Sequence, residues 1–292
     1  MSTAGRFEKF LANTTTTSAD HEDATRKVNT VAKKLHEKYY FFRSYNGSTV
    51  KVIGSYGKGT QRRPPRDVDI LFILPEGVYR RFDQYSGNGQ SALLQECKSV
   101  LLKRYPTTDV RGDGQVVVVP FSDGHSVEVL PGWKRPDGKY TVPNTHDGGS
   151  WQVVDHDAEI AYVENSDIRS KGNTRNLIGM MKAWQDNCNV PIKSLALELR
   201  AVNFLETWEH YDKDAHYYDW MVRDFFAELI GKRNGTCIIP GTEDKYHYGN
   251  AWLSRAESAH GRAVKACELE SKKSERAATV EWQKIFGDRY EF

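Results

Sequence analysis

Two aspartates with one residue between them open an apolar run in the first quarter of the sequence. Asp67 and Asp69 flank Val68, and the run from Ile70 to Leu74 follows directly. In a β-strand, residues i and i+2 point to the same face, so both carboxylates are expected to project together. Such a pair repels unless a cation lies between the two groups. Mg²⁺ prefers carboxylate oxygens and substrate phosphate, and two ions about 4 Å apart can hold the attacking and leaving oxygens of a phosphoryl transfer.

A third carboxylate completes many two-metal sites, and the sequence offers two candidates. Glu128 stands between two valines in the strand-like run SVEVLPGW, where an unpaired buried charge would be costly. If this run pairs with the strand that follows Asp67, Glu128 joins the aspartates; the alternative for Glu128 is a solvated position on an edge strand. Asp123, the second candidate, lies in a Ser-Asp-Gly turn, and a turn-forming role explains it better than a catalytic one.

A glycine-rich segment, GSYGKGT, precedes the aspartates and is predicted to be a loop. Gly54 allows a close backbone approach to phosphate oxygens, while Ser55 and Thr60 add hydroxyl donors. The segment matches neither the G-x-x-x-x-G-K-[ST] phosphate loop nor the G-x-G-x-x-G dinucleotide motif. A D-x-D pair alone is common on protein surfaces. The same pair after this loop, with a later carboxylate inside a strand, is a rarer set that indicates phosphate and metal chemistry.

Helices and strands are both predicted around these residues. A helix from Ser18, a suitable N-cap, carries one apolar stripe and is expected to lie on a sheet. The sheet is expected to be mixed or largely antiparallel, and the Gly- and Pro-rich stretch 132–158 is expected to be an extended connection. The remaining predictions are helices at 2–13, 90–105, 194–208, 217–230, 251–267 and 278–286, a helix from Thr174, strands at 48–53 and 68–74, and an antiparallel hairpin of 116–119 with 126–130.

Composition narrows the function classes. The chain has 292 residues and a net charge of +2, which argues against a strongly basic nucleic-acid footprint. No run approaches the roughly 20 apolar residues of a membrane span, and the N-terminus lacks the apolar segment of a signal peptide. The four cysteines are widely spaced, which favours reduced thiols. We therefore expect a cytoplasmic protein that requires neither a membrane nor a stable RNA or DNA partner.

The order of the motifs resembles a known family. GSYGKGT, RPPRDVDILFILP, VEVLPGW, NTRNLIGMMKAWQ and VPIKSLALELRAVNFLE are similar to the bacterial cGAS/DncV-like nucleotidyltransferases of CBASS anti-phage defence. These enzymes are part of the DNA polymerase β-type superfamily. The resemblance covers roughly residues 5–230 and is closest to the members associated with HORMA-type proteins.

This resemblance implies an α+β, two-lobed polymerase β-like fold, with a mixed sheet flanked by helices and a C-terminal helical lobe. The catalytic lobe would be residues 1–160, with the N-terminal helices packed against it, and residues 161–292 would close the NTP cleft. The resemblance also implies NTP substrates, ATP among them, two Mg²⁺ ions with Mn²⁺ as an alternative, and a cyclic di- or trinucleotide product that contains adenine. A HORMA-type activator protein is the implied partner.

The family's motifs also imply roles for residues of the catalytic lobe. Gly54 and Ser55 fall on the GS motif that binds the donor triphosphate, and Asp67 and Asp69 fall on the metal-binding pair. Glu128 falls where many members have aspartate. The charge is the same but the side chain is longer, so the metal geometry departs from the family pattern at this position.

Two residues of the helical lobe match the family's triphosphate contacts. Lys182 and Ser194 fall where the family has a lysine and a serine near the triphosphate. From the residues alone, Lys182 is better explained as a solvated helix lysine. Ser194 suits a helix N-cap, which is compatible with a phosphate contact because helix N-termini bind anions.

The main hypothesis is a metal-dependent nucleotidyltransferase in which a ribose hydroxyl attacks an α-phosphate, pyrophosphate leaves and a ring closes. An RNA-tailing enzyme of the poly(A) or CCA-adding type is one alternative, and the near-neutral charge argues against it. An antitoxin-like nucleotidyltransferase that acts on a protein partner is another, and the large helical half makes it less favoured. The set of carboxylates argues against a nucleotide-binding pseudoenzyme.

Overall fold

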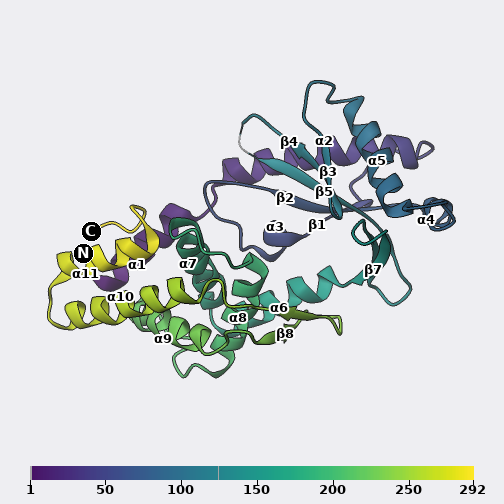
Figure 1. Cartoon of the computed structure of the whole chain (residues 1–292). Helices are drawn as coiled ribbons and strands as arrows, with labels where there is room; N and C mark the ends of the chain where they lie inside the picture. The colour runs from purple at the N-terminus through teal and green to yellow at the C-terminus, as the bar shows by residue number, and fades with distance from the viewer. Residues whose placement is uncertain (1, 124) are drawn as a thin grey trace. The chain divides into compact units, whose positions relative to one another are not determined.

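The computed structural model describes residues 2–123 and 125–292, which form two compact units (Figure 1). The sheet-bearing unit comprises residues 16–160. The helical unit joins the N-terminal residues through Thr15 to residues 161–292. Within the described residues, no helix is long and apolar enough to cross a membrane.

The sheet-bearing unit is built on one mixed sheet. Strands follow the order β1-β2-β5-β4-β3, and β6 joins β5 to β7. β2 and β5 run parallel, and the other pairs are antiparallel, which confirms the predicted mixed α+β class. The elements are α2 (Ser18–Tyr39), β1 (Val50–Val52), α3 (Gly54–Lys58), β2 (Val68–Ile73), α4 (Glu76–Asp83), α5 (Gly89–Leu102), β3 (Arg111–Asp113), β4 (Val116–Pro120), β5 (Ser126–Lys134), β6 (Tyr140–Asn144), β7 (Ser150–Val154) and the first residues of α6 (His156–Arg169).

The two faces of this sheet bury different side chains. Val68, Ile70 and Val129 enter the larger core, which the apolar stripe of α2 and the buried face of α5 complete. The opposite face carries a smaller cluster that includes Leu71 and Leu130. Because side chains alternate along a strand, the odd-numbered Asp69 of β2 and the even-numbered Glu128 of β5 share this second face with the two leucines.

Three segments of this unit differ from their predictions. GSYGKGT contains the short helix α3 rather than a loop, and residues 76–83 form α4, which was not predicted. The stretch 132–158 is not an extended connection, because it completes β5 and contains β6 and β7. Its glycines and aspartates occupy the tight turns between these strands, where Gly138 and Asp147 have positive φ. Gly124, expected in the turn before β5, lies outside the described residues.

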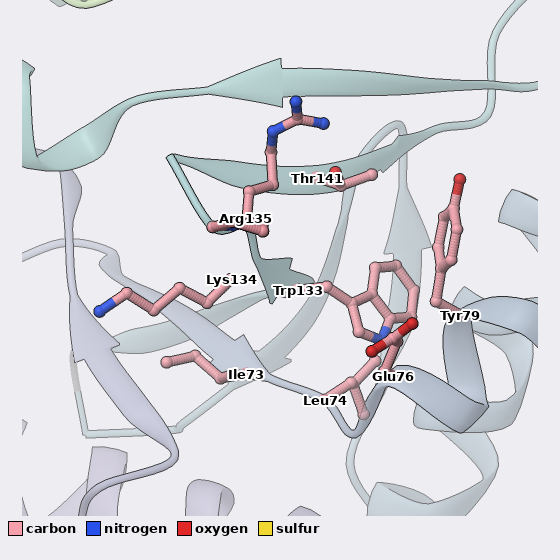
Figure 2. Close-up of a pocket in the computed structure, with 9 residues that line it drawn as sticks. Ile73, Leu74, Glu76, Tyr79, Trp133, Lys134, Arg135 and Thr141 are labelled. Carbon is pink, nitrogen blue, oxygen red and sulfur yellow. The ribbon is translucent and has the colours of Figure 1, made fainter. Parts of the chain in front are cut away.

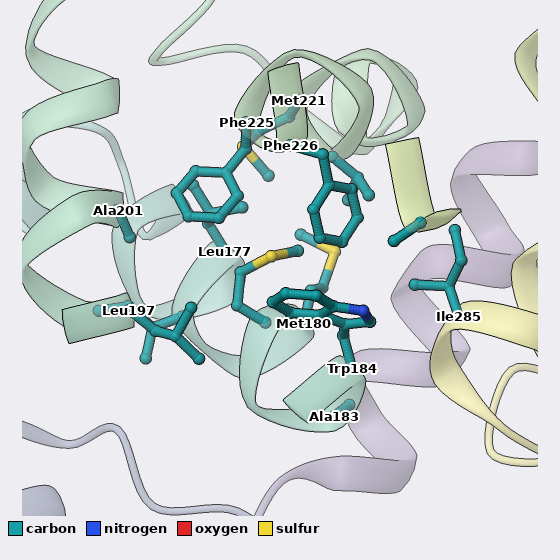
Figure 3. Close-up of a cluster of buried hydrophobic side chains, with 14 of the residues drawn as sticks. Leu177, Met180, Ala183, Trp184, Leu197, Ala201, Met221, Phe225, Phe226 and Ile285 are labelled. Atoms are coloured by element: carbon teal, nitrogen blue, oxygen red, sulfur yellow. The ribbon is translucent and has the colours of Figure 1, made fainter. Parts of the chain in front are cut away.

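The helical unit packs around aromatic and methionine side chains (Figure 3). Trp184 of α7 meets Phe226 of α9 edge to face, with ring centroids 4.9 Å apart. The run 216–226 therefore supplies several core residues, which are Tyr218, Met221, Val222, Phe225 and Phe226. The elements are α1 (Thr3–Thr14), the rest of α6, α7 (Asn173–Asn187), α8 (Ser194–Thr207), η1 (Ala215–Tyr217), α9 (Tyr218–Ile230), β8 (Thr236–Ile238), β9 (Lys245–His247), α10 (Leu253–Ser271) and α11 (Glu275–Phe286).

Helix α1 packs in the helical unit, whereas the expected division placed it with the sheet. Phe7 is fully buried with its ring centroid 5.2 Å from that of Trp282, and Phe10 stacks on Phe286 at 4.7 Å. The buried guanidinium of Arg6 pairs with Glu270 of α10 at 2.7 Å. These contacts join residues that are more than 260 positions apart in the chain, so local sequence patterns could not reveal them.

We expect Phe7→Ala to destabilise the helical unit by about 3–5 kcal/mol, because it empties a fully enclosed aromatic site. Chemical denaturation followed by tryptophan fluorescence would measure this loss. Phe41→Ala is the matched control, since Phe41 is 74% exposed and its loss should change stability by less than about 0.5 kcal/mol. Equal effects of the two substitutions would contradict the assignment of α1 to this core.

Candidate active site

Parallel pairing of β2 with β5 brings two of the predicted carboxylates together. Asp69 is the register partner of Glu128. Adjacent strands lie about 4.8 Å apart, so the two residues are direct neighbours on the face opposite α2 and α5. Asp67 lies immediately before β2, and its carboxylate accepts a hydrogen bond from Ser126 Oγ at the start of β5. The strand of Glu128 therefore lies beside the strand of the aspartates, as the three-carboxylate hypothesis requires.

The pKa of Glu128 reflects its burial and its position beside the two aspartates. Burial raises the pKa of its carboxyl group to about 7, and the negative charges of Asp69 and Asp67 add to the effect. Asp113 raises the same pKa and Arg111 lowers it. These two residues of β3 were not among the sequence candidates, although their i, i+2 spacing places both on one face of the strand. The negative potential at Glu128 favours a bound cation.

The carboxylates share a face without converging on one point. In the part of the chain that the structure describes, no three His, Cys, Asp or Glu side chains are grouped so as to hold a metal ion. Asp67 is turned toward Ser126, and Asp69 lies against Gly54. Three oxygen-donor groups with excess negative charge nevertheless fit the chemistry of Mg²⁺ or Mn²⁺. Joint coordination would require these side chains to rotate.

Gly54 is the residue that allows α3 to start beside Asp69. Its φ is +59°, in the left-handed region, and a Cβ at this position would lie 1.9 Å from Asp69 Oδ2. Both the backbone conformation and the available space therefore require glycine. The backbone N–H of Ile53 donates to the carbonyl oxygen of Asp69 at 2.9 Å, which fixes the start of α3 to β2. Gly54 is thus held next to Asp69, in a helical turn and not in the predicted loop.

Asp123, the competing third carboxylate, serves a different contact. It accepts a hydrogen bond from the buried Nζ of Lys27 on α2. Asp23, one turn earlier on α2, binds the same ammonium group at 2.6 Å. The neighbours that shift the pKa of Asp123 are Lys27 and Asp23, whereas those of Glu128 include the two aspartates. Glu128 is therefore the better third member of the carboxylate cluster.

The two predicted triphosphate contacts of the helical unit have partners that the sequence did not reveal. Lys182 is 12% exposed, and its Nζ donates to Glu198 Oε1 at 2.7 Å, so the solvated-lysine alternative is wrong. Ser194 is the first residue of α8 rather than its N-cap, which is Lys193, and its hydroxyl donates to Gln185 Oε1 at 3.1 Å. A contact of either residue with a triphosphate stays a prediction.

A pocket of about 600 Å³ opens at the far ends of β2 and β5 (Figure 2). Tyr79 and Trp133 pack edge to face in it, with centroids 5.1 Å apart, and Lys134 lies on the same stretch of β5. Ile73 lines the pocket four residues beyond Asp69, roughly 13 Å along the strand. The pocket is therefore separate from the carboxylate cluster.

Comparisons with known proteins agree with this geometry. A model of the Second Messenger Oligonucleotide or Dinucleotide Synthetase domain, SMODS, matches residues 1–166. No curated protein matches the sequence.

Solved structures show the same fold over nearly the whole chain. A structure of Escherichia coli CdnC with ATP has 17% identity and a TM-score of 0.69, and covers 99% of this chain and 98% of that one. A complex of E. coli CdnC with HORMA-deltaN has 15% identity and a TM-score of 0.70, with 99% and 98% covered. Vibrio cholerae DncV, a cyclic AMP-GMP synthase in complex with a linear intermediate, has 15% identity and a TM-score of 0.68, with 99% and 87% covered. At these identities the similarity establishes the fold, and it confirms the predicted two-lobed architecture.

We expect Gly54→Ala to cost several kcal/mol of stability and to weaken Mn²⁺ binding at least about tenfold, because the new methyl group collides with the Asp69 carboxylate. Denaturation and the electron paramagnetic resonance signal of free Mn²⁺ would measure both effects. Gly47→Ala is the matched control: φ is +83° but no atom lies within 4 Å of the new Cβ. The Gly47→Ala variant should lose only the roughly 1–2 kcal/mol of stability that a left-handed alanine costs. Its Mn²⁺ affinity should stay at the wild-type value. Similar losses of Mn²⁺ affinity in the Gly54→Ala and Gly47→Ala variants would rule out the steric explanation.

Glu128 should make the metal-free protein less stable as pH rises. An acid whose pKa is raised by folding loses stability between its usual pKa, 4.5, and its folded value, about 7, because the unfolded chain ionises first. Relative to Glu128→Gln, the wild-type protein should lose about 3 kcal/mol of unfolding free energy across this window. Urea denaturation at several pH values in the presence of a chelator would measure the difference. Parallel stability curves for the two proteins would show that Glu128 is not crowded by negative charge.

Proposed function

The chain belongs to the Second Messenger Oligonucleotide or Dinucleotide Synthetase family, and on this premise we propose that it joins NTPs into a cyclic oligonucleotide with release of pyrophosphate. The family match also confirms the resemblance that the sequence motifs indicated. The observation that supports the proposal most strongly is the register pairing of Asp69 with Glu128, with Asp67 two residues before Asp69. Gly54 lies against Asp69, so the segment that we propose to bind phosphate begins beside the carboxylates.

The three carboxylates have distinct tasks in this proposal. Asp67, Asp69 and Glu128 would hold two Mg²⁺ ions, which when bound neutralise phosphate charge and activate the attacking ribose hydroxyl. Glu128 would also accept the hydroxyl proton, because it lies beside Asp69 in the carboxylate cluster. The hydrogen bond from Ser126 restricts the rotation of Asp67.

Four residues are proposed as contacts of the donor triphosphate. Gly54 supplies close backbone approach and Ser55 a hydroxyl group, while Lys182 and Ser194 contribute from the helical unit. Lys182 can contact a phosphate oxygen without losing Glu198, because an ammonium group has three N–H donors. Glu198 would then keep the Lys182 side chain ordered before the nucleotide arrives.

We also propose an adenine-containing di- or trinucleotide product, a HORMA-type activator and a cytoplasmic role in anti-phage signalling. Support comes from the CdnC structures, one with ATP and one with HORMA-deltaN, and from the DncV structure with its linear intermediate. The RNA-tailing and antitoxin-like alternatives have no comparable structural observation in their favour. The net charge of +2 remains an argument against a large RNA-binding surface.

Asp69→Asn should lower product formation by roughly 10³-fold or more while leaving the fold intact, because it removes a charged ligand without changing the size of the side chain. Purified protein would be incubated with all four NTPs and Mg²⁺, without RNA. Phosphatase-resistant product would then be identified by mass spectrometry. Asp137→Asn is the matched control, since Asp137 is an exposed turn residue paired with Arg135, and it should retain wild-type activity.

The outcomes separate the alternatives. Chelation of divalent ions should abolish synthesis by the wild-type protein and by the Asp137→Asn control. Undiminished synthesis by Asp69→Asn would refute the metal assignment. Extension of added RNA, with no product from NTPs alone, would instead identify a tailing enzyme. If neither product forms, adding a HORMA-type protein tests whether synthesis depends on an activator.

A further inference from the structure

Helix α3 carries Gly54 and Ser55 but is too short to hold its own conformation. It has five residues, and its N-cap position, Ile53, provides no side-chain cap. Helix nucleation is unfavourable, so a single turn depends on tertiary contacts. At the C-terminal end of α3, the buried Lys58 lies 3.8 Å from Glu159. The central residue, Tyr56, is held by a second set of contacts.

Tyr56 is the end of a buried hydrogen-bond chain. Its hydroxyl group lies 2.7 Å from His125 Nε2, and His125 Nδ1 lies 2.9 Å from Asp23 Oδ2. His125 is 2% exposed. Asp23 belongs to α2, His125 directly precedes β5, and Tyr56 belongs to α3, so the chain connects three separate elements of the sheet-bearing unit.

The direction of each hydrogen bond is determined by Asp23. The hydrogen bond from Lys27 is the main reason that the pKa of Asp23 falls to about 2, with His125 and Arg26 contributing. An ionised carboxylate only accepts hydrogen bonds, so His125 Nδ1 must be the donor. In the neutral ring, Nε2 then offers only a lone pair, to which the Tyr56 hydroxyl donates. With a neutral His125 ring, the chain therefore has one hydrogen-bonding arrangement.

The same stretch of chain also contacts the carboxylate cluster. His125 is followed by Ser126, whose hydroxyl group donates to Asp67. Tyr56 is the residue after Ser55, on the helix that begins at Gly54. One dipeptide, His125–Ser126, thus contacts both Asp67, a proposed metal ligand, and the helix predicted to bind triphosphate.

We propose that His125 is a positioning residue, which fixes α3 through the Asp23–His125–Tyr56 chain and so sets Gly54 and Ser55 relative to Asp67 and Asp69. This inference rests on the proposed role of Gly54 and Ser55 in binding the triphosphate. His125 acts through Tyr56 in this role and contacts no reacting atom.

Tyr56→Phe is the most selective test, because it removes only the hydroxyl group. It leaves His125 Nε2 without its donor, and we expect KM for NTP to rise roughly tenfold while kcat falls less than about threefold. His125→Ala should have a similar effect, and the double variant should be no worse than either single one, because both break the same chain. His125→Gln should recover part of the loss, since its amide oxygen can accept from Tyr56.

Tyr45→Phe is the matched control. Its hydroxyl group also donates to a side chain of the sheet-bearing unit, Asn29 Oδ1 at 2.9 Å, but it has no contact with α3 among the described interactions. KM and kcat should both stay at the wild-type values. A tenfold rise in KM for this variant would show that any lost tyrosine hydroxyl gives the effect, and it would overturn the specific role of His125.

Amide hydrogen exchange separates positioning from general destabilisation. In Tyr56→Phe, exchange should rise in the peptide covering residues 53–60, with little change elsewhere. Unchanged KM and unchanged exchange would overturn the proposal, as would a lower Tm without either change. Absence of any product from the wild-type protein, both alone and with a HORMA-type protein added, would refute the proposed function instead. The exchange measurement would then still decide whether this chain holds α3.

Discussion

Two negative charges side by side on neighbouring strands define the electrostatics of the sheet-bearing unit. Asp69 and Glu128 are register partners, and their register depends on the apolar residues that alternate with them. A slip of one residue would turn Val68 and Ile70 away from α2 and α5, so burial of the apolar face enforces the repulsion on the polar one. Burial and, after it, this repulsion raise the pKa of Glu128 in the protein without a cation.

Polar contacts fix the orientation of the short helix α3, which the apolar core does not determine. Hydrophobic burial sets the sheet and the positions of α2 and α5, but it does not determine the orientation of a one-turn helix such as α3. Gly54 lets this helix approach Asp69, and Tyr56 and Lys58 attach it to β5 and α6. The apolar core therefore supplies stability, whereas the polar contacts set the orientation of α3. Substitutions in the core should lower the free energy of unfolding, and substitutions in the polar contacts should change KM.

Sequence patterns predicted the strand residues of the site better than its helical and loop residues. Period-2 alternation placed Asp67 and Asp69 on one face and marked Glu128 as an unusual charge inside a strand. The α3 helix was missed because glycine and polar residues are typical of loops, and only tertiary contacts make them helical here. Lys182 was misjudged because its partner, Glu198, lies on another helix. No local pattern marks His125, because its two partners are distant in sequence. Tyr56 lies 69 positions away and Asp23 lies 102 positions away.

The position of α1 has a consequence for synthesis on the ribosome. Residues 16–160 form a unit that is continuous in sequence and can be completed while translation proceeds, whereas Phe7 and Phe10 must wait for Trp282 and Phe286. At roughly 5–20 residues per second, that delay is some tens of seconds. During this interval a nascent amphipathic helix displays its apolar side without a partner. The segment around Phe7 and Phe10 is therefore synthesised long before the residues on which it packs, and it is among the last parts of the chain to fold.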